Sequence, residues 1–152
     1  MNPLEGRRAD LRALLEAETS RLGQAAAHLR WSLARCESLG PGPWPPDLLE
    51  RLESMASRFA RLSDLLTQRV MRLADELELE APGSLLDRIR RAEKRGWAQS
   101  DGQLVRVREL RNLIAHEYED EDLPALYAEV QRLAPTLLHA VDRALDWARQ
   151  VN

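Results

Sequence analysis

Apolar residues recur every three or four positions along most of this chain, and that spacing predicts helices rather than strands. The longest series belongs to a helix expected to begin at Asp47, an N-cap candidate with Glu50 three residues later, and to end before Pro82 and Gly83. Its apolar positions keep an almost unbroken alternation of three- and four-residue steps. They are Leu48, Leu52, Met55, Phe59, Leu62, Leu66, Val70, Leu73 and Leu77.

Glycine and proline separate this helix from the one before it. The preceding helix is expected from about Arg8 to about Ser38, because the loop at 40–46 contains four prolines and two glycines and cannot be helical throughout. Its apolar series includes Cys36, the only cysteine of the chain. We therefore expect a buried, inert thiol there.

A capping box marks the start of the next helix. Ser84 and Asp87 have the spacing at which each side chain satisfies a free backbone N–H of the other residue. This predicts a short helix to about Arg95, which Gly96 would end.

Two further helices are expected in the last third of the chain. The first runs from about Gln103 to about Tyr118, and the second begins near Asp122 as its cap, with Pro124 in the first turn. The apolar positions of the second are Leu126, Val130, Leu133, Leu137, Val141, Leu145 and Ala148.

Together these elements predict an all-α fold, an antiparallel bundle of about five helices, in a single domain at 1–152. Four large side chains at helical spacing, Met55, Phe59, Trp31 and Trp147, are expected to pack in the core or in an interface.

Charge and hydropathy limit the possible partners. The formal net charge is -3, so the whole chain lacks the strongly basic character of many nucleic-acid-binding domains. No stretch approaches the roughly 18 apolar residues of a membrane span. The first residues alternate acidic and basic side chains before any apolar run of a secretory signal. A cytoplasmic protein without a membrane partner is expected.

Phosphate-binding loops and metal motifs are absent from the sequence. Neither G-x-x-x-x-G-K-[ST] nor G-x-G-x-x-G occurs, which disfavours nucleotide hydrolysis. His28, His116 and His139 are scattered, and no H-x-x-x-H or C-x-x-C pair is present. The acidic run at 117–122 lacks the glycine and terminal glutamate of a calcium loop. We therefore predict neither a metal site nor a cofactor.

Polar side chains interrupt the apolar pattern of the helix expected at 103–118. Arg111 and Tyr118 are seven residues apart and would share nearly the same helical azimuth, while Asn112 and His116 would share a neighbouring face. Arginine carries a permanent charge that matches phosphate, and histidine can give or take a proton near neutral pH. Tyrosine and asparagine can orient the arginine and the histidine through hydrogen bonds.

This set of groups suits cleavage of RNA through its own 2′-hydroxyl. The reaction needs a base, an acid and a cation for the charge that develops at phosphorus, and it requires no metal. Each chain supplies one clustered histidine. A two-fold dimer that buries this helix against its mate would bring two sets of Arg111 and His116 into one cleft.

The segment from Arg111 to Tyr118 resembles the R-x4-H-x-Y signature of HEPN-domain proteins, specifically the HepT-type toxins encoded beside a minimal nucleotidyltransferase. The resemblance extends to 84–89, to Gly96-Trp97, to 107–110 and to the acidic run at 119–122, so about the C-terminal half of the chain takes part. Related proteins include substrate-binding partners of nucleotidyltransferases.

The resemblance implies a HEPN-like homodimer with metal-independent endoribonuclease activity, the toxin of a type VII-like toxin–antitoxin pair. It implies that Arg111 stabilises the phosphate and that His116 transfers protons, and Asn112 matches the polar residue that often follows the arginine. Tyr118 would match the tyrosine that a cognate nucleotidyltransferase antitoxin modifies with AMP. A bulky anion there would block the phosphate site.

Basic residues are concentrated just before the motif. Residues 88–111 hold eight basic and three acidic side chains. Arg91, Arg106 and Arg108 are therefore candidates for contacts with RNA phosphates.

Two other interpretations remain open. Arg111 also fits a surface ion pair with a carboxylate on the Glu109 side or in a loop, with His116 as an ordinary surface histidine. The chain also fits a non-catalytic substrate-binding or regulatory subunit of a minimal nucleotidyltransferase.

Overall fold

The computed structural model describes residues 2–116 and 122–151, and within these ranges the chain consists of helices and connecting loops, with no strand. The helices are α1 (Pro3–Cys36), α2 (Pro46–Asp64), the π-helical segment η1 (Leu65–Val70), α3 (Met71–Leu77), α4 (Leu85–Lys94), α5 (Gln103–Ala115) and α6 (Leu123–Val151). Because α2, η1 and α3 follow one another without a break, the described residues form five helical rods. The predicted all-α bundle of about five helices is confirmed.

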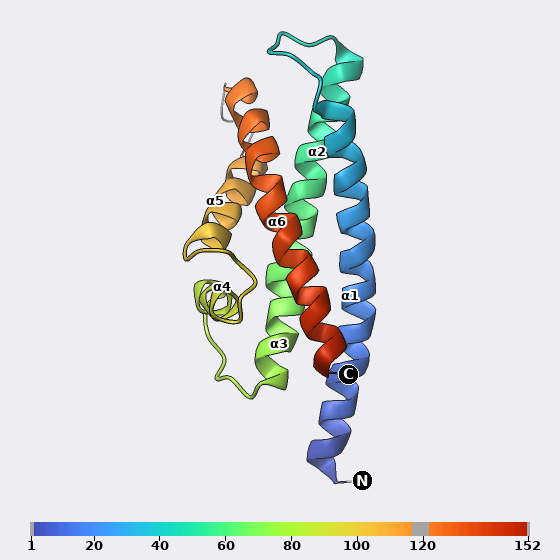
Figure 1. The fold of residues 1–152 in the computed structure, drawn as a ribbon, viewed down its shortest axis with the longest axis vertical. Coiled ribbons are helices and arrows are strands. Elements are labelled where there is room, and N and C mark those ends of the chain that lie inside the picture. The colour runs from blue at the N-terminus through green and yellow to red at the C-terminus, as the bar shows by residue number, and fades with distance from the viewer. Residues whose placement is uncertain (1, 117–121, 152) are drawn as a thin grey trace.

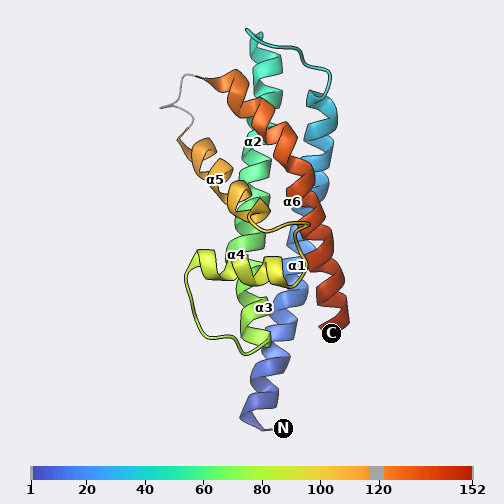
Figure 2. The same ribbon diagram turned by 60° about the vertical axis from the view of Figure 1, so that its left-hand side comes forward.

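Three long rods lie side by side and carry the remaining helices (Figure 1). They are α1, the rod formed by α2, η1 and α3, and α6. Helix α1 runs antiparallel to the other two, and α5 runs antiparallel to α2 and α6, with which it packs. Helix α4 lies across the rods below α5 (Figure 2). Helices α4 and α5 therefore cover one side of the bundle, and α1 forms the opposite edge.

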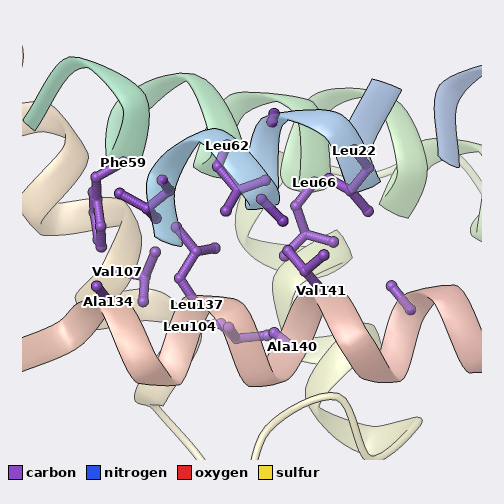
Figure 3. Close-up of a cluster of buried hydrophobic side chains, with 14 of the residues drawn as sticks. Leu22, Phe59, Leu62, Leu66, Leu104, Val107, Ala134, Leu137, Ala140 and Val141 are labelled. Carbon is purple, nitrogen blue, oxygen red and sulfur yellow. The ribbon is translucent and has the colours of Figure 1, made fainter. Parts of the chain in front are cut away.

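The core lies between the three long rods. Leu22 of α1, Phe59 of α2, Leu66 of η1 and Leu137 of α6 point into the same space and are fully buried (Figure 3). Burial of each such side chain contributes about 1.5 to 3 kcal/mol. All nine apolar positions predicted for the second rod are buried or half-buried, as the spacing requires.

Two of the three predicted helix caps are confirmed. Ser84 and Asp87 form the predicted capping box at the start of α4. Asp122 accepts a hydrogen bond of 3.1 Å from the Ala125 N–H at the start of α6, as predicted.

A second capping box, between Asn2 and Glu5, begins α1 at Pro3 rather than at about Arg8. The N-cap predicted at Asp47 is wrong. Pro45 occupies that position, because Pro46 fits the first turn, where its missing N–H is not needed.

Trp31 is the exception among the large side chains expected to be packed. Met55 and Phe59 are buried, and Trp147 is half-buried against Trp97, whereas Trp31 is 59% exposed. The predicted core position of Trp31 is wrong, because the buried side chains of α1, such as Leu22 and Leu29, lie on the opposite side of the helix. Its role in an interface stays a prediction.

Cys36 is buried, as predicted, and burial raises the pKa of its thiol, since the charged thiolate would lose solvation. Its Sγ donates a hydrogen bond to the Arg51 carbonyl at 3.4 Å. Across the described residues, no helix is long and apolar enough to cross a bilayer.

Candidate functional site

Helix α5 carries most of the predicted site. Its buried residues Leu104, Val107, Leu110 and Ile114 face α2 and α6, and this fixes the directions of the polar side chains between them. The helix ends at Ala115, with His116 as its C-cap, and does not reach Tyr118 as predicted. Tyr118, which was expected to share its azimuth with Arg111, lies outside the described residues.

Arg111 is held by a carboxylate that the sequence analysis missed. Its Nε donates to Oδ1 of Asp64 at 2.8 Å, and its Nη2 donates to Oδ2 at 2.9 Å, which is the two-pronged geometry of an arginine–carboxylate pair. Arg108 Nη1 also donates to Oδ1 of Asp64, at 3.0 Å. The three side chains form what we call the Asp64 clamp.

The Asp64 clamp lies at the edge of the bundle rather than in its core. The side chains of Asp64 and Arg111 are 31% and 26% exposed. Two positive charges face one negative charge, so the clamp keeps an excess of positive charge at this edge. Hydrogen bonds to Asp64 and its charge raise the pKa of Arg111 by more than burial lowers it.

The clamp leaves part of the Arg111 guanidinium available. A guanidinium has five N–H donors, and Asp64 takes one from Nε and one from Nη2. Both donors of Nη1 make no hydrogen bond to any described residue. Arg111 is therefore fixed in direction and still able to donate to an anion.

A change in helix type follows Asp64 directly. The π-helical segment η1 begins at Leu65, and the Thr67 hydroxyl donates to the Ser63 carbonyl at 2.8 Å. Single π-helical turns inside α-helices are frequent at functional sites. No sequence spacing links Asp64 to Arg111, because 47 residues separate them.

The other two predicted side chains lie on the outward side of α5. Asn112 and His116 are exposed, and the His116 N–H donates to the Leu113 carbonyl at 3.1 Å, which closes the last turn. Leu113, between them, is 52% exposed. Helix α5 therefore carries a fixed guanidinium on the side that faces α2, and an imidazole and an apolar side chain on its outward side.

The candidate RNA-binding arginines have different surroundings. Arg108 belongs to the Asp64 clamp, and Arg91 donates to Asp75 and to the Ala81 carbonyl, each at 2.9 Å. Arg106 is exposed and makes no ion pair within the described ranges.

Arg106 lines a groove of about 600 Å³ between α4 and α5, together with Arg90 and Lys94. Acidic side chains line the same groove, namely Glu93, Asp101 and Glu109. Among the described residues, no three or more histidine, cysteine or acidic side chains gather closely enough to hold a metal ion.

Comparison of the chain with protein-family models, with curated proteins and with solved structures finds no match.

Proposed function

We propose that the protein is a metal-independent endoribonuclease that acts as a homodimer and cleaves RNA by attack of the 2′-hydroxyl. The observation that carries this proposal is the Asp64 clamp, which fixes Arg111 at the surface while both Nη1 donors make no hydrogen bond to the described residues. A preorganised cation of this kind stabilises the charge that develops on phosphate oxygens in the transition state.

His116 would supply proton transfer at the same edge. One imidazole takes the proton of the 2′-hydroxyl as the 2′-oxygen bonds to phosphorus, and a second gives a proton to the 5′-oxygen as its bond to phosphorus breaks. The products are a 2′,3′-cyclic phosphate and a 5′-hydroxyl. Because two imidazoles act in one event, each of two subunits contributes its His116.

The exposed apolar side chain on α5 supports such a dimer. Leu113 lies between Asn112 and His116 and is largely uncovered in the single chain. A two-fold pairing along α5 would bury Leu113 of both subunits and bring both His116 side chains to one cleft. Substitution Leu113→Glu is expected to separate this dimer.

Cleavage of RNA in the presence of a chelator tests the proposal. The wild-type protein is expected to give cyclic-phosphate ends in EDTA, and His116→Ala is expected to abolish cleavage without loss of helical circular dichroism. His28→Ala, which changes an exposed histidine on α1, is the matched control and should cleave normally. Cleavage that persists in His116→Ala would contradict the assigned role.

The proposal includes silencing by a nucleotidyltransferase that adds AMP to Tyr118. An adenylyl group near Arg111 would place a competing phosphate at the cation. Mass spectrometry of the protein co-expressed with a nucleotidyltransferase encoded beside it should find one adenylyl group, and Tyr118→Phe should remove it. An unmodified chain that is nevertheless inhibited would contradict this part.

A non-catalytic subunit of a nucleotidyltransferase is the second candidate. The Asp64 clamp joins α5 to α2 by itself, and this favours a structural role for Arg108 and Arg111. Stable co-purification with the nucleotidyltransferase, together with wild-type protein that does not cleave RNA, would establish this alternative.

A further inference from the structure

Trp31 is exposed on the outer face of α1, the edge of the bundle that lies opposite α4 and α5 (Figure 1). The Arg35 guanidinium lies over its ring at 4.6 Å from the centroid, and that of Arg58 lies at 5.6 Å. Tryptophan and arginine are the residues most enriched among those that dominate the energy of protein interfaces.

A stripe of uncharged side chains runs along the outer face of α1 for about six turns of helix, with Glu16 and Arg35 beside it. At steps of three or four residues, seven consecutive positions of this face are exposed and uncharged, although 31% of the chain is charged. They are Ala13, Ala17, Ser20, Gln24, Ala27, Trp31 and Ala34. A helix face that remains in water normally carries charged residues. The inward face of α1, with Leu15, Leu22 and Leu29, is already packed in the core.

A groove lies at the other end of the same face. Ala9 and Ala13 of α1 line a groove of about 650 Å³ with Leu145 and Ala148 of α6. Charged side chains line the same groove, namely Arg12, Glu16 and Arg149. Ala13 and Trp31 are eighteen residues apart, or about 27 Å along a helix that rises 1.5 Å per residue. One end of the face therefore projects a large ring, and the other end has small side chains beside a recess.

We propose that this face binds a second copy of the chain, with the two α1 helices antiparallel and related by a two-fold axis near Leu22. In that arrangement Trp31 of each subunit packs against Ala13 and the adjoining groove of the other. Ala17 then faces Ala27 of the partner subunit. A two-fold interface requires each contact to occur twice, and this pairing satisfies the requirement because the ring and the recess are equally far from the axis.

The charges beside the face select the antiparallel arrangement. It brings Asp10 close to Arg35 of the partner subunit and Glu16 close to Arg30 of the partner subunit, so that opposite charges meet. Asp10, Glu16 and Arg35 form no ion pair with any described residue of their own chain, whereas Arg30 pairs with Asp142 at 3.1 Å across the surface. Parallel helices would instead place each charged residue beside the same residue of the partner subunit, so that like charges would meet. This self-complementarity favours a second copy over an unrelated partner.

This interface is distinct from the dimer proposed along α5 and does not depend on it. Helices α1 and α5 lie on opposite sides of the bundle, so one subunit can use both faces at once (Figures 1 and 2). A chain with two two-fold interfaces assembles into a tetramer or a larger complex.

Light scattering after size-exclusion chromatography measures the mass that tests the proposal. Trp31→Glu is expected to halve the mass of the wild-type complex without loss of helical circular dichroism. Leu14→Glu, at a similarly exposed apolar residue on another side of α1, is the matched control and should keep the mass. An unchanged mass in Trp31→Glu would overturn the proposal.

Charge reversal distinguishes pairing of two copies from loss of folding. Asp10→Arg and Arg35→Asp are each expected to weaken association, and the double variant should restore it because the opposite charges have exchanged places. Failure of the double variant to restore the mass would overturn the antiparallel arrangement. RNA cleavage by Trp31→Glu should match that of the wild type. The mass of the complex therefore tests the α1 interface, and the cleavage rate separately tests the proposed activity.

Discussion

Two aspartates on the second rod each bind two arginines from a neighbouring helix, and their surroundings differ. Asp64 binds Arg108 and Arg111 of α5 at the edge of the bundle. Asp75 binds Arg91 of α4 and Arg95 at its C-cap, and the side chains of Asp75 and Arg95 are only 8% and 9% exposed. We call this second group the Asp75 clamp. The aspartate and one arginine are therefore enclosed in the Asp75 clamp, whereas all three charges of the Asp64 clamp are partly open to solvent.

The enclosed group is part of a wider network that holds α4. Arg95 Nε also donates to Glu78, and the Trp147 indole N–H of α6 donates to the same carboxylate. The Arg95 guanidinium lies 5.8 Å from the centroid of the Trp97 ring. Nη1 of Arg95 makes no hydrogen bond to the described residues, but it is buried, so a ligand cannot reach its donors. An aspartate with two arginines therefore indicates a binding site only where the structure leaves donors exposed.

The largest difference between the clamps is expected in stability. Asp75→Asn removes the buried carboxylate that pairs with the enclosed Arg95 and should lower the free energy of unfolding by about 3 kcal/mol. Asp64→Asn removes a partly exposed carboxylate and should cost about 1 kcal/mol. Urea denaturation of both variants measures the difference, and equal losses would contradict the distinction drawn between the two clamps.

The opposite order is expected for the proposed RNA cleavage. Arg111→Lys loses the two-pronged contact with Asp64 and should lower the cleavage rate by about 100-fold. Arg91→Lys makes the equivalent change in the Asp75 clamp and should leave the rate unchanged at a temperature where the variant is folded. A comparable loss in both variants would place Arg91 at the RNA.

A smaller effect is expected at the two helix ends beside the Asp75 clamp. Both α3 and α4 end in a residue with a left-handed backbone, Leu79 at φ 60° and Gly96 at φ 88°. Leu79 is exposed, so Leu79→Gly should raise the free energy of unfolding by about 1 kcal/mol, while Gly96→Ala should lower it by about the same amount. Thermal unfolding measures both, and a destabilised Leu79→Gly would show that the backbone strain there is negligible.

The smallest effect concerns the N-cap of α4. Hydrogen bonds from Ser84 lower the pKa of Asp87 below 3.8, so its ionised form stabilises the folded chain. That contribution to stability is complete above pH 3.8, the ordinary pKa of an aspartate, and is lost as the pH falls through the lowered pKa. Asp87→Asn should therefore be less stable than wild type at neutral pH and equally stable in strong acid, as urea denaturation at each pH would show. A difference that persists in acid would mean that the charge is not responsible.

Local patterns predicted the helices well, because their causes are local. The capping box at Ser84 and the cap at Asp122 join residues three apart, and both are confirmed. Asp47 failed as a cap because two prolines before it start the helix earlier. The π-helical segment coincides with two successive four-residue steps, Leu62 to Leu66 to Val70. That signal is not specific, since α6 has three such steps and stays α-helical.

The candidate site was predicted only in part. The sequence singled out Arg111, Asn112 and His116 from their types and spacing, and the structure places all three at or next to the end of α5. Asp64 was missed, because an acidic residue in a long amphipathic helix has no local feature that marks it as a partner of α5. The exposure of Trp31 was also missed.

The sequence alone determined that the chain forms helices, roughly where each one lies and which side of it is apolar, because backbone hydrogen bonding and burial act over three to five residues. The tertiary structure decided which arginines are enclosed and which are exposed, because their carboxylates lie 16 to 47 residues away. Burial also depends on which other helices cover a side chain. The packing of α4 and α5 against the second rod therefore separates an enclosed clamp from a candidate site.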